Sequence, residues 1–404
     1  MNAHEMAKWF FIICALIPSV FTQCTIEKAG PYFSRSVYEF SVELLRRISQ
    51  ETENHFVAST LSPWTLLAYT SLGAADSSLD ELKTILRLHP HKCFNNKFFE
   101  ITKRIYTPAG ETTLEGTSAI FVDERIPVYE TFQNQVRKAG ISEIREVSLE
   151  NYEYVAASIN NYVKTATNGA IDEIVVASDL ENVVMMIIDA LRFKGTWETP
   201  FMANATEVMP FVDELGNEIG QVNIMTLTSN FKLKYMDEIN ATILELPYSD
   251  NRFSMLLFVP YREVKLSNVI YSLKRISLKS IFSYFSTSEL QEVTVQLPRF
   301  KISSDLNNLK ELLIDMGLHS IFDSTQASFP DISEYPLYIS NLIQKADVEV
   351  TEEGTLASAA TRADFSSRSF PITVAANKPF FFTIVDKETT IPVFVGAYSK
   401  PSVY

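Results

Sequence analysis

The sequence predicts a single α+β domain, with helices concentrated in the first third of the chain and strands in the remainder. Apolar residues recur at helical spacing early in the sequence, whereas short apolar or alternating runs dominate later. Because these segments do not alternate regularly, their order favours α+β over a doubly wound parallel sheet. No repeat or linker divides the 404 residues, a length sufficient to bury one large core.

The helical pattern is clearest in four segments. In each of them, apolar side chains recur every three or four positions and would line one face of a helix. The third and fourth follow the same pattern as the first, whereas the second comes after Ser62-Pro63, which we interpret as a turn. The predicted helices are 38–48, 65–72, 80–86 and 156–166.

The strand pattern begins near the middle of the chain. Residues 183–189 (VVMMIID) form a continuous apolar run, as expected of a central strand that is covered on both faces. Polar residues at 248–252 form a turn cluster between two further strands. The other predicted strands are 241–246, 253–259, 293–297, 346–350, 379–385 and 392–398.

The N-terminus carries the pattern of a secretory leader. Its apolar run, residues 10–21, is too short to span a bilayer but fits the core of a signal peptide. The alternative is a buried N-terminal helix. We expect a signal peptide at 1–24, with cleavage near Cys24, and a mature domain at 25–404. The protein would then be secreted and extracellular.

The predicted leader determines what we expect of the cysteines and the sequons. Cys14 lies in the leader and Cys24 at its edge, so the mature chain would keep only Cys93 and have no internal disulfide. Two Asn-x-Thr triplets begin at Asn204 and Asn240. They would accept glycans on the secretory route, although such triplets also arise by chance.

Charge and motifs argue against several classes of function. The net charge of -14 argues against a nucleic-acid partner, which requires clustered Lys and Arg. Signatures of nucleophile elbows and of nucleotide-binding loops are missing from the sequence. His89 and His91, close to Cys93, are the one metal-like cluster, but no third ligand follows at zinc-site spacing. We therefore expect a solvated loop there, no metal or cofactor, and no enzymatic activity.

A small-residue segment near the C-terminal end is the most informative. Residues 354–368 read GTLASAATRADFSSR, with small residues at every second position from Thr355 to Thr361. Alternate residues share one face of a strand, so this face would fit beneath a packed layer. Composition alone favours a flexible surface loop instead.

The surrounding sequence resembles the serpin family. Residues 345–355 (KADVEVTEEGT) resemble the strand and proximal hinge that lead into the reactive-centre loop of serpins. Residues 189–197 (DALRFKGTW) resemble the serpin pattern Asn-Ala-x-x-Phe-Lys-Gly-x-Trp, with Pro-Phe at 200–201. The resemblance covers about residues 38–401, and its further landmarks are LPY at 246–248, SM at 254–255, LPRF at 297–300 and PFFF at 379–382.

The resemblance implies a serpin-like fold and a function. N-terminal helices would pack on a large central β-sheet, with further sheets and an exposed reactive-centre loop at about 352–375. In serpins the scissile bond lies fourteen residues beyond the hinge glycine, which here is the bond between Arg368 and Ser369. Cleavage at the competing Arg362 would leave only half a strand to insert. The implied hinge residues are Glu352, Glu353, Gly354, Thr355, Ala357, Ala359, Ala360 and Thr361.

A basic residue before the scissile bond fits the S1 pocket of trypsin-like proteases. The resemblance therefore implies a monomeric suicide inhibitor that forms a covalent complex with a trypsin-like serine protease and has no membrane partner. The alternative is a non-inhibitory serpin that acts as a carrier or chaperone. Bulky, charged or proline residues in the hinge would favour that alternative.

The sequence departs from the family at the shutter, the region beneath the sheet opening. Asp189 replaces the usual Asn and Gln344 the usual His, while Thr65 replaces a Ser in the motif that begins at Ser62-Pro63. We expect Asp189 and Gln344 to compensate each other, because a carboxylate can accept a hydrogen bond from an amide.

Two outward-facing residues of the loop and a basic cluster do not change this prediction. Leu356 and Ser358 would face outward after insertion of the loop and would not block it. A basic cluster lies where some serpins bind sulfated glycans, but Glu100 within it favours a solvated helix face, so we do not expect glycosaminoglycan activation. The residues of this cluster are Lys92, Lys97, Lys103 and Arg104.

Overall fold

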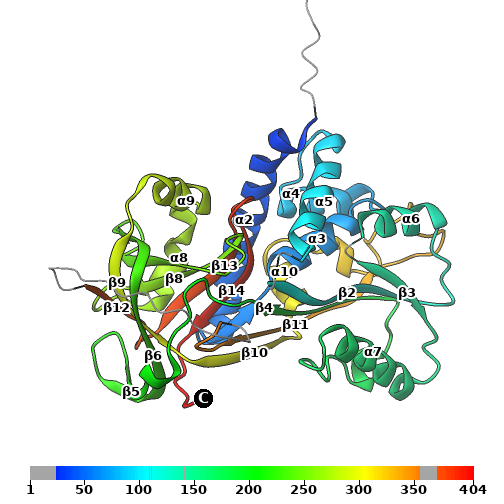
Figure 1. The fold of residues 1–404 in the computed structure, drawn as a ribbon. Helices are drawn as coiled ribbons and strands as arrows, with labels where there is room; N and C mark the ends of the chain where they lie inside the picture. Colours follow the sequence, from blue (N-terminus) through cyan, green and yellow to red (C-terminus); the bar gives the residue numbers. More distant parts are fainter. Residues whose placement is uncertain (1–23, 109, 111, 141, 355–370) are drawn as a thin grey trace, which may run out of the picture.

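The computed structural model describes residues 24–404 except 109, 111, 141 and 355–370, and it confirms the α+β class (Figure 1). The α-helices are α2 (Ile26–Glu51), α3 (Leu61–Thr70), α4 (Asp76–Leu86), α5 (Lys92–Tyr106), α6 (Glu130–Ala139), α7 (Tyr152–Ala166), α8 (Leu266–Ser272), α9 (Leu278–Thr287) and α10 (Leu309–Asp315). Short 3-10 helices lie at Ala177–Leu180, Ala203–Ala205, Leu273–Arg275 and Ser320–Phe322.

The strands form two sheets. The nine-stranded sheet has the order β1-β14-β13-β8-β7-β6-β9-β12, with β5 paired to β6, and the five-stranded sheet has the order β10-β11-β4-β2-β3. Their bounds are β1 (Phe56–Ala58), β2 (Thr113–Asp123), β3 (Glu143–Val147), β4 (Met185–Lys194), β5 (Thr206–Val212), β6 (Glu218–Met236), β7 (Ala241–Pro247), β8 (Phe253–Pro260), β9 (Gln291–Pro298), β10 (Phe300–Leu306), β11 (Ile339–Val350), β12 (Ile372–Ala375), β13 (Phe380–Asp386) and β14 (Ile391–Tyr398).

The five-stranded sheet is covered on both faces, as the apolar run of β4 predicted (Figure 1). Helix α7 packs Ile159 and Val163 against Ile188 of β4 and Ile343 of β11. The large main core, to which Trp64 of α3 belongs, lies on the opposite face. Strands β4 and β11 are adjacent and parallel, and we call the junction between them the seam.

One predicted turn was wrong. Ser62 and Pro63 belong to α3, which begins at Leu61 and ends at Thr70. Pro63 lies in the first turn, where a backbone N–H has no partner within the helix, so proline is tolerated there. The helix is buried on every side and therefore lacks an amphipathic pattern that would have marked its start.

The expectation of no disulfide was also wrong. Cys24 is bonded to Cys93, which joins the segment before α2 to the first turn of α5. The two residues are 69 positions apart, and their Cα atoms lie 6.3 Å from each other. Sequence patterns assigned Cys24 to the edge of a leader and could not show this proximity.

The described residues contain neither a membrane-spanning helix nor a metal-binding cluster. None of the described helices is both long and apolar enough to cross a membrane. Within the same part of the chain, no group of three or more His, Cys, Asp or Glu side chains is arranged to hold a metal ion. His89 and His91 lie in the loop between α4 and α5.

Candidate functional site

The hinge that follows β11 begins at the top of the seam. Thr351 and Gly354 exchange backbone hydrogen bonds of 2.9 and 3.2 Å, which close a tight turn. Gly354 also forms an antiparallel bridge with Thr196, two residues beyond the end of β4. It has φ +115°, and a Cβ atom there would lie 2.5 Å from the carbonyl oxygen of Gly195, so the position requires glycine. The chain at Gly354 therefore lies between the ends of β4 and β11.

The two hinge glutamates are held by the segment beyond β4. The carboxylate of Glu352 accepts a hydrogen bond of 2.7 Å from Thr206 and lies 3.5 Å from the guanidinium of Arg299. The backbone N–H of Trp197 donates to the carbonyl of Glu353 at 3.1 Å. These contacts fix the direction in which the chain leaves β11.

The shutter lies lower in the seam, around a fully buried carboxylate. Asp189 accepts hydrogen bonds from Ser62 Oγ (2.5 Å), Ser118 Oγ (2.6 Å) and Gln344 Nε2 (2.6 Å). The bond expected between Asp189 and Gln344 is therefore present. Gln344 also exchanges two bonds with the backbone of Ser59, of 3.0 and 2.8 Å. Every polar atom of the Gln344 amide group is thus engaged.

Burial dominates the electrostatics of the shutter. It raises the pKa of Asp189 to about 6, although the three hydrogen bonds oppose the shift. No cation among the described residues contributes to this pKa. The neighbouring hydroxyl of Tyr106 is buried as well, and its pKa is raised by that burial and by the Asp189 charge.

Of the side chains that donate hydrogen bonds to Asp189, Ser62 and Gln344 were named from the sequence and Ser118 was not. Thr65 does lie in α3, but its hydroxyl donates to the carbonyl of Leu61 at 2.8 Å. Ser118 of β2 was missed, although it binds Asp189 directly. Only the pairing of β2 with β4 places Ser118 opposite Asp189, and no pattern in a single sequence reveals that register.

A second polar pair crosses the seam on the opposite face of the sheet. Arg192 Nε of β4 lies 3.9 Å from Asp347 Oδ1 of β11, and Arg192 also approaches Glu349 at 3.7 Å. Lys301 of β10 lies 3.5 Å from the other carboxylate oxygen of Asp347. Burial raises the pKa of Asp347, while Lys301 and Arg192 oppose that shift.

The remaining predicted residues are placed as follows. The proposed scissile bond, Arg368–Ser369, and the predicted hinge residues after Gly354 all lie outside the described residues. Of the predicted hinge, Glu352, Glu353 and Gly354 are described. Asn204 and Asn240 are exposed. Helix α5 carries the basic cluster.

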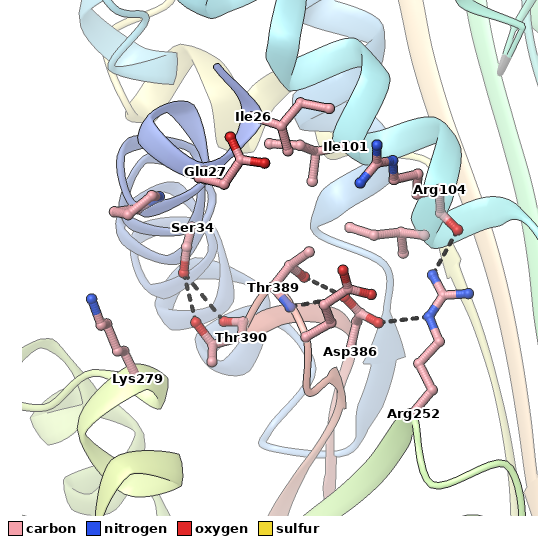
Figure 2. A pocket seen from close by; sticks show the side chains of 14 residues that line it. Ile26, Glu27, Ser34, Ile101, Arg104, Arg252, Lys279, Asp386, Thr389 and Thr390 are labelled. Atoms are coloured by element: carbon pink, nitrogen blue, oxygen red, sulfur yellow. Dashed lines mark hydrogen bonds and ion pairs between the residues drawn. The ribbon is translucent and has the colours of Figure 1, made fainter. Parts of the chain in front are cut away.

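A pocket of about 340 Å³ lies between α2, α5 and the turn that joins β13 to β14 (Figure 2). Arg252 donates to Asp386 at 2.8 Å and to the carbonyl of Arg104 at 2.6 Å. Ser34 and Thr390 share a hydrogen bond of 2.9 Å across the pocket wall. Because these polar groups bind one another, the pocket is a junction between elements rather than a candidate site.

Comparison with known proteins decides what the hinge and the seam belong to. A family model described as Serpin (serine protease inhibitor) matches residues 35–401. The chain belongs to the serpin family. The resemblance inferred from the hinge and the other landmarks is therefore confirmed.

Similar proteins support the same conclusion. The chain is 29% identical to mouse macrophage plasminogen activator inhibitor 2, over 90% of this chain and 98% of that protein. The structure of native protease nexin-1 with heparin superposes with a TM-score of 0.81 at 26% identity, covering 93% of this serpin and all of that chain. Serpin-12 of Manduca sexta has a TM-score of 0.81 at 25% identity, over 91% and 99%. The serpin fold predicted from the sequence is confirmed.

Proposed function

We propose that this serpin is a secreted suicide inhibitor of trypsin-like serine proteases, cleaved between Arg368 and Ser369. The observation that carries the proposal is the position of Gly354, which pairs with Thr351 on one side and with Thr196 on the other. A strand continued from Gly354 would enter the seam between β4 and β11.

The mechanism follows from this entry point. The protease serine attacks the Arg368 carbonyl, the peptide bond breaks, and the Ser369 amine leaves with a proton, which gives an acyl-enzyme. The freed segment then inserts between β4 and β11 as an added antiparallel strand and carries the attached protease with it. Because the closed sheet is metastable relative to the inserted form, a kinetic barrier protects it until cleavage.

The side chains of the segment suit this insertion. Counting pairs from the bridges at Gly354 brings Thr361 opposite both Asp189 and Gln344. Thr355, Ala357 and Ala359 would share the face of Thr361 and point to the same side of the sheet. Their small size lets that face pass beneath the packed layer without displacing it.

The proposal includes secretion, but the predicted end of the leader is moved. Cys24 is bonded to Cys93, so we place the end of a removable leader before Cys24 rather than after it. A structural disulfide is typical of oxidising compartments. The exposed Asn204 and Asn240 are the expected glycan acceptors on that route.

Incubation with trypsin, followed by a denaturing gel, tests the proposed inhibition. The expected product is a complex of about the summed size, together with a C-terminal fragment that begins at Ser369. Arg368→Ala should abolish the complex, whereas Arg362→Ala, the same change at the competing site, should retain it. Clean cleavage without a complex would overturn the proposal and favour the non-inhibitory alternative, a carrier or chaperone.

A further inference from the structure

The pair Arg192–Asp347 is incomplete in the closed sheet. Arg192 Nε and Asp347 Oδ1 are both buried, and neither has a hydrogen-bond partner among the described residues. Asp347 as a whole is 1% exposed. The two atoms face each other at 3.9 Å, too far apart for a direct hydrogen bond. Buried charged atoms without partners are costly, so the two atoms call for a physical explanation.

The register of the hinge determines which residue would arrive between them. Gly354 forms antiparallel bridges with Thr351 and with Thr196. Counting pairs down β11 from the first bridge brings residue 358 opposite Asp347, and counting down β4 from the second brings the same residue opposite Arg192. The two counts are consistent because Asp347 and Arg192 are themselves register partners. Directly opposed residues share a face of a sheet, so residue 358 would point between the two charged groups.

Residue 358 is a serine. A hydroxyl donates one hydrogen bond and accepts others, whereas a carboxylate oxygen only accepts and a guanidinium N–H only donates. Insertion of a strand would increase the separation of β4 and β11 by about 4.8 Å, the spacing of neighbouring strands. The direct approach of Arg192 to Asp347 would then be lost, and a hydroxyl between them would satisfy both.

On the basis of the function proposed above, we infer that Arg192 and Asp347 form a receptor for the Ser358 hydroxyl of the inserted loop. In the closed sheet Arg192 Nε and Asp347 Oδ1 lack hydrogen-bond partners among the described residues, and this raises the free energy of that state. In the inserted sheet the Ser358 hydroxyl donates to Asp347 and accepts from Arg192. The pair thus favours insertion in the register that the hinge sets. Arg192 and Asp347 are positioning residues for the inhibitory step.

The test compares native protein with protein nicked in the loop after Phe365 by an aromatic-specific protease. This nick frees the segment that contains Ser358 and does not depend on the Arg368 bond. Guanidinium chloride unfolding is measured for both forms. In wild type, the nicked form should have a much higher midpoint. Ser358→Ala should leave the native midpoint unchanged, lower the midpoint of the nicked form, and make the nicked form unfold about tenfold faster or more.

The matched control moves the hydroxyl along the same face. S358A/A360S keeps the composition of the loop but places the hydroxyl opposite Lys345 and Ala190, and it should be as weak as Ser358→Ala. Ser358→Thr retains the hydroxyl and should recover most of the midpoint. In an Asp347→Val background, the further effect of Ser358→Ala should disappear.

The outcomes separate this inference from the function on which it rests. If nicked wild type is no more stable than the native form, loop insertion itself is wrong, and the proposed inhibition fails with it. If nicked wild type is stabilised and Ser358→Ala or S358A/A360S is stabilised equally, insertion holds and only the hydroxyl receptor is overturned.

Discussion

Two polar pairs cross the same seam only three residues apart, and they differ in how completely they are bonded. Asp189 and Gln344 lie on one face and share a hydrogen bond of 2.6 Å within a network in which both side chains are satisfied. Arg192 and Asp347 lie on the other face, 3.9 Å apart, each with an orphaned buried atom. The first pair holds the sheet closed, whereas the second gains its hydrogen bonds only when the sheet opens.

The difference shows how a sheet that must open can still be kinetically stable. A seam with complete side-chain hydrogen bonding at every position would resist insertion of a strand. A seam without any such bonding would open spontaneously. Here the pair Asp189–Gln344 stabilises the closed sheet, and the pair Arg192–Asp347 favours its opening. Substitutions in the two pairs should therefore have separate effects. Metastable folds need this separation, because their function depends on a barrier rather than on the lowest free energy.

The largest effect on the stability of the native form is expected at Gln344, in the fully hydrogen-bonded pair. Gln344→Ala removes the partner of Asp189 and of both backbone groups of Ser59 in a buried site. Unsatisfied buried groups of this kind cost about 1–3 kcal/mol each, so the native form should lose roughly 3 kcal/mol or more. Guanidinium chloride unfolding of the native protein measures the loss. Gln326→Ala, the same change in an exposed turn, is the control and should cost little; equal losses would show that Gln344 does not stabilise the closed sheet.

The second effect lies outside the seam and tests whether overall stability and insertion are separable. Replacing both Cys24 and Cys93 by Ser should lower the free energy of unfolding by about 2–4 kcal/mol, because a long loop in the unfolded chain is released. The gain in midpoint on nicking the loop should persist. Cys24→Ser alone should match the double variant, since either change removes the bond. Loss of the nicking gain would show that the N-terminal segment and the seam are coupled.

How much of this could be foreseen from the sequence depends on distance along the chain. The fold class and the hinge followed from local patterns and from the landmarks around Gly354. The Asp189–Gln344 bond was expected only because the resemblance aligned both residues with a known region. Helix α3 was misplaced because a fully buried helix has no polar face to mark its start.

Other features depended on strand register, which a single sequence does not show. Ser118 meets Asp189 only through the pairing of β2 with β4. Arg192 and Asp347 are 155 positions apart and meet only because β4 and β11 are parallel neighbours. Without that register, the sequence predicts only that Ser358 is a small residue facing outward after insertion.

The third effect is a pH dependence of the unfolding free energy that arises from Asp189. The pKa of Asp189 is about 6 in the folded protein, above the ordinary 3.8, so the folded state binds this proton more tightly than the unfolded state does. The unfolding free energy should therefore fall as the pH rises from about 4 to about 6 and then level off. Asp189→Asn keeps an oxygen acceptor for Gln344 but cannot ionise, and it should remove this slope.

The variant should consequently be more stable than wild type at neutral pH, by at most about 3 kcal/mol, and closest to it near pH 4. Asp315→Asn, at a carboxyl that is 72% exposed, should leave the slope in place. Unfolding midpoints across this pH range measure both. Parallel profiles for wild type and Asp189→Asn would show that the shutter carboxyl does not titrate as described.

The smallest effect is expected at the incomplete pair in the native form. Asp347→Asn removes a buried charge, which usually costs stability when its partner is left alone. Here three features oppose that cost: Asp347 Oδ1 lacks a hydrogen bond, Arg192 keeps Glu349 at 3.7 Å, and the nearest cations lie no closer than 3.5 Å. Removal of the desolvation cost should nearly offset the lost attraction, so we expect the native free energy of unfolding to change by less than about 1 kcal/mol. Asp305→Asn, which breaks a more exposed pair with Lys345, is the matched control and should change as little. A native loss as large as that of Gln344→Ala would mean that both pairs hold the closed sheet, and the contrast between them would then be wrong.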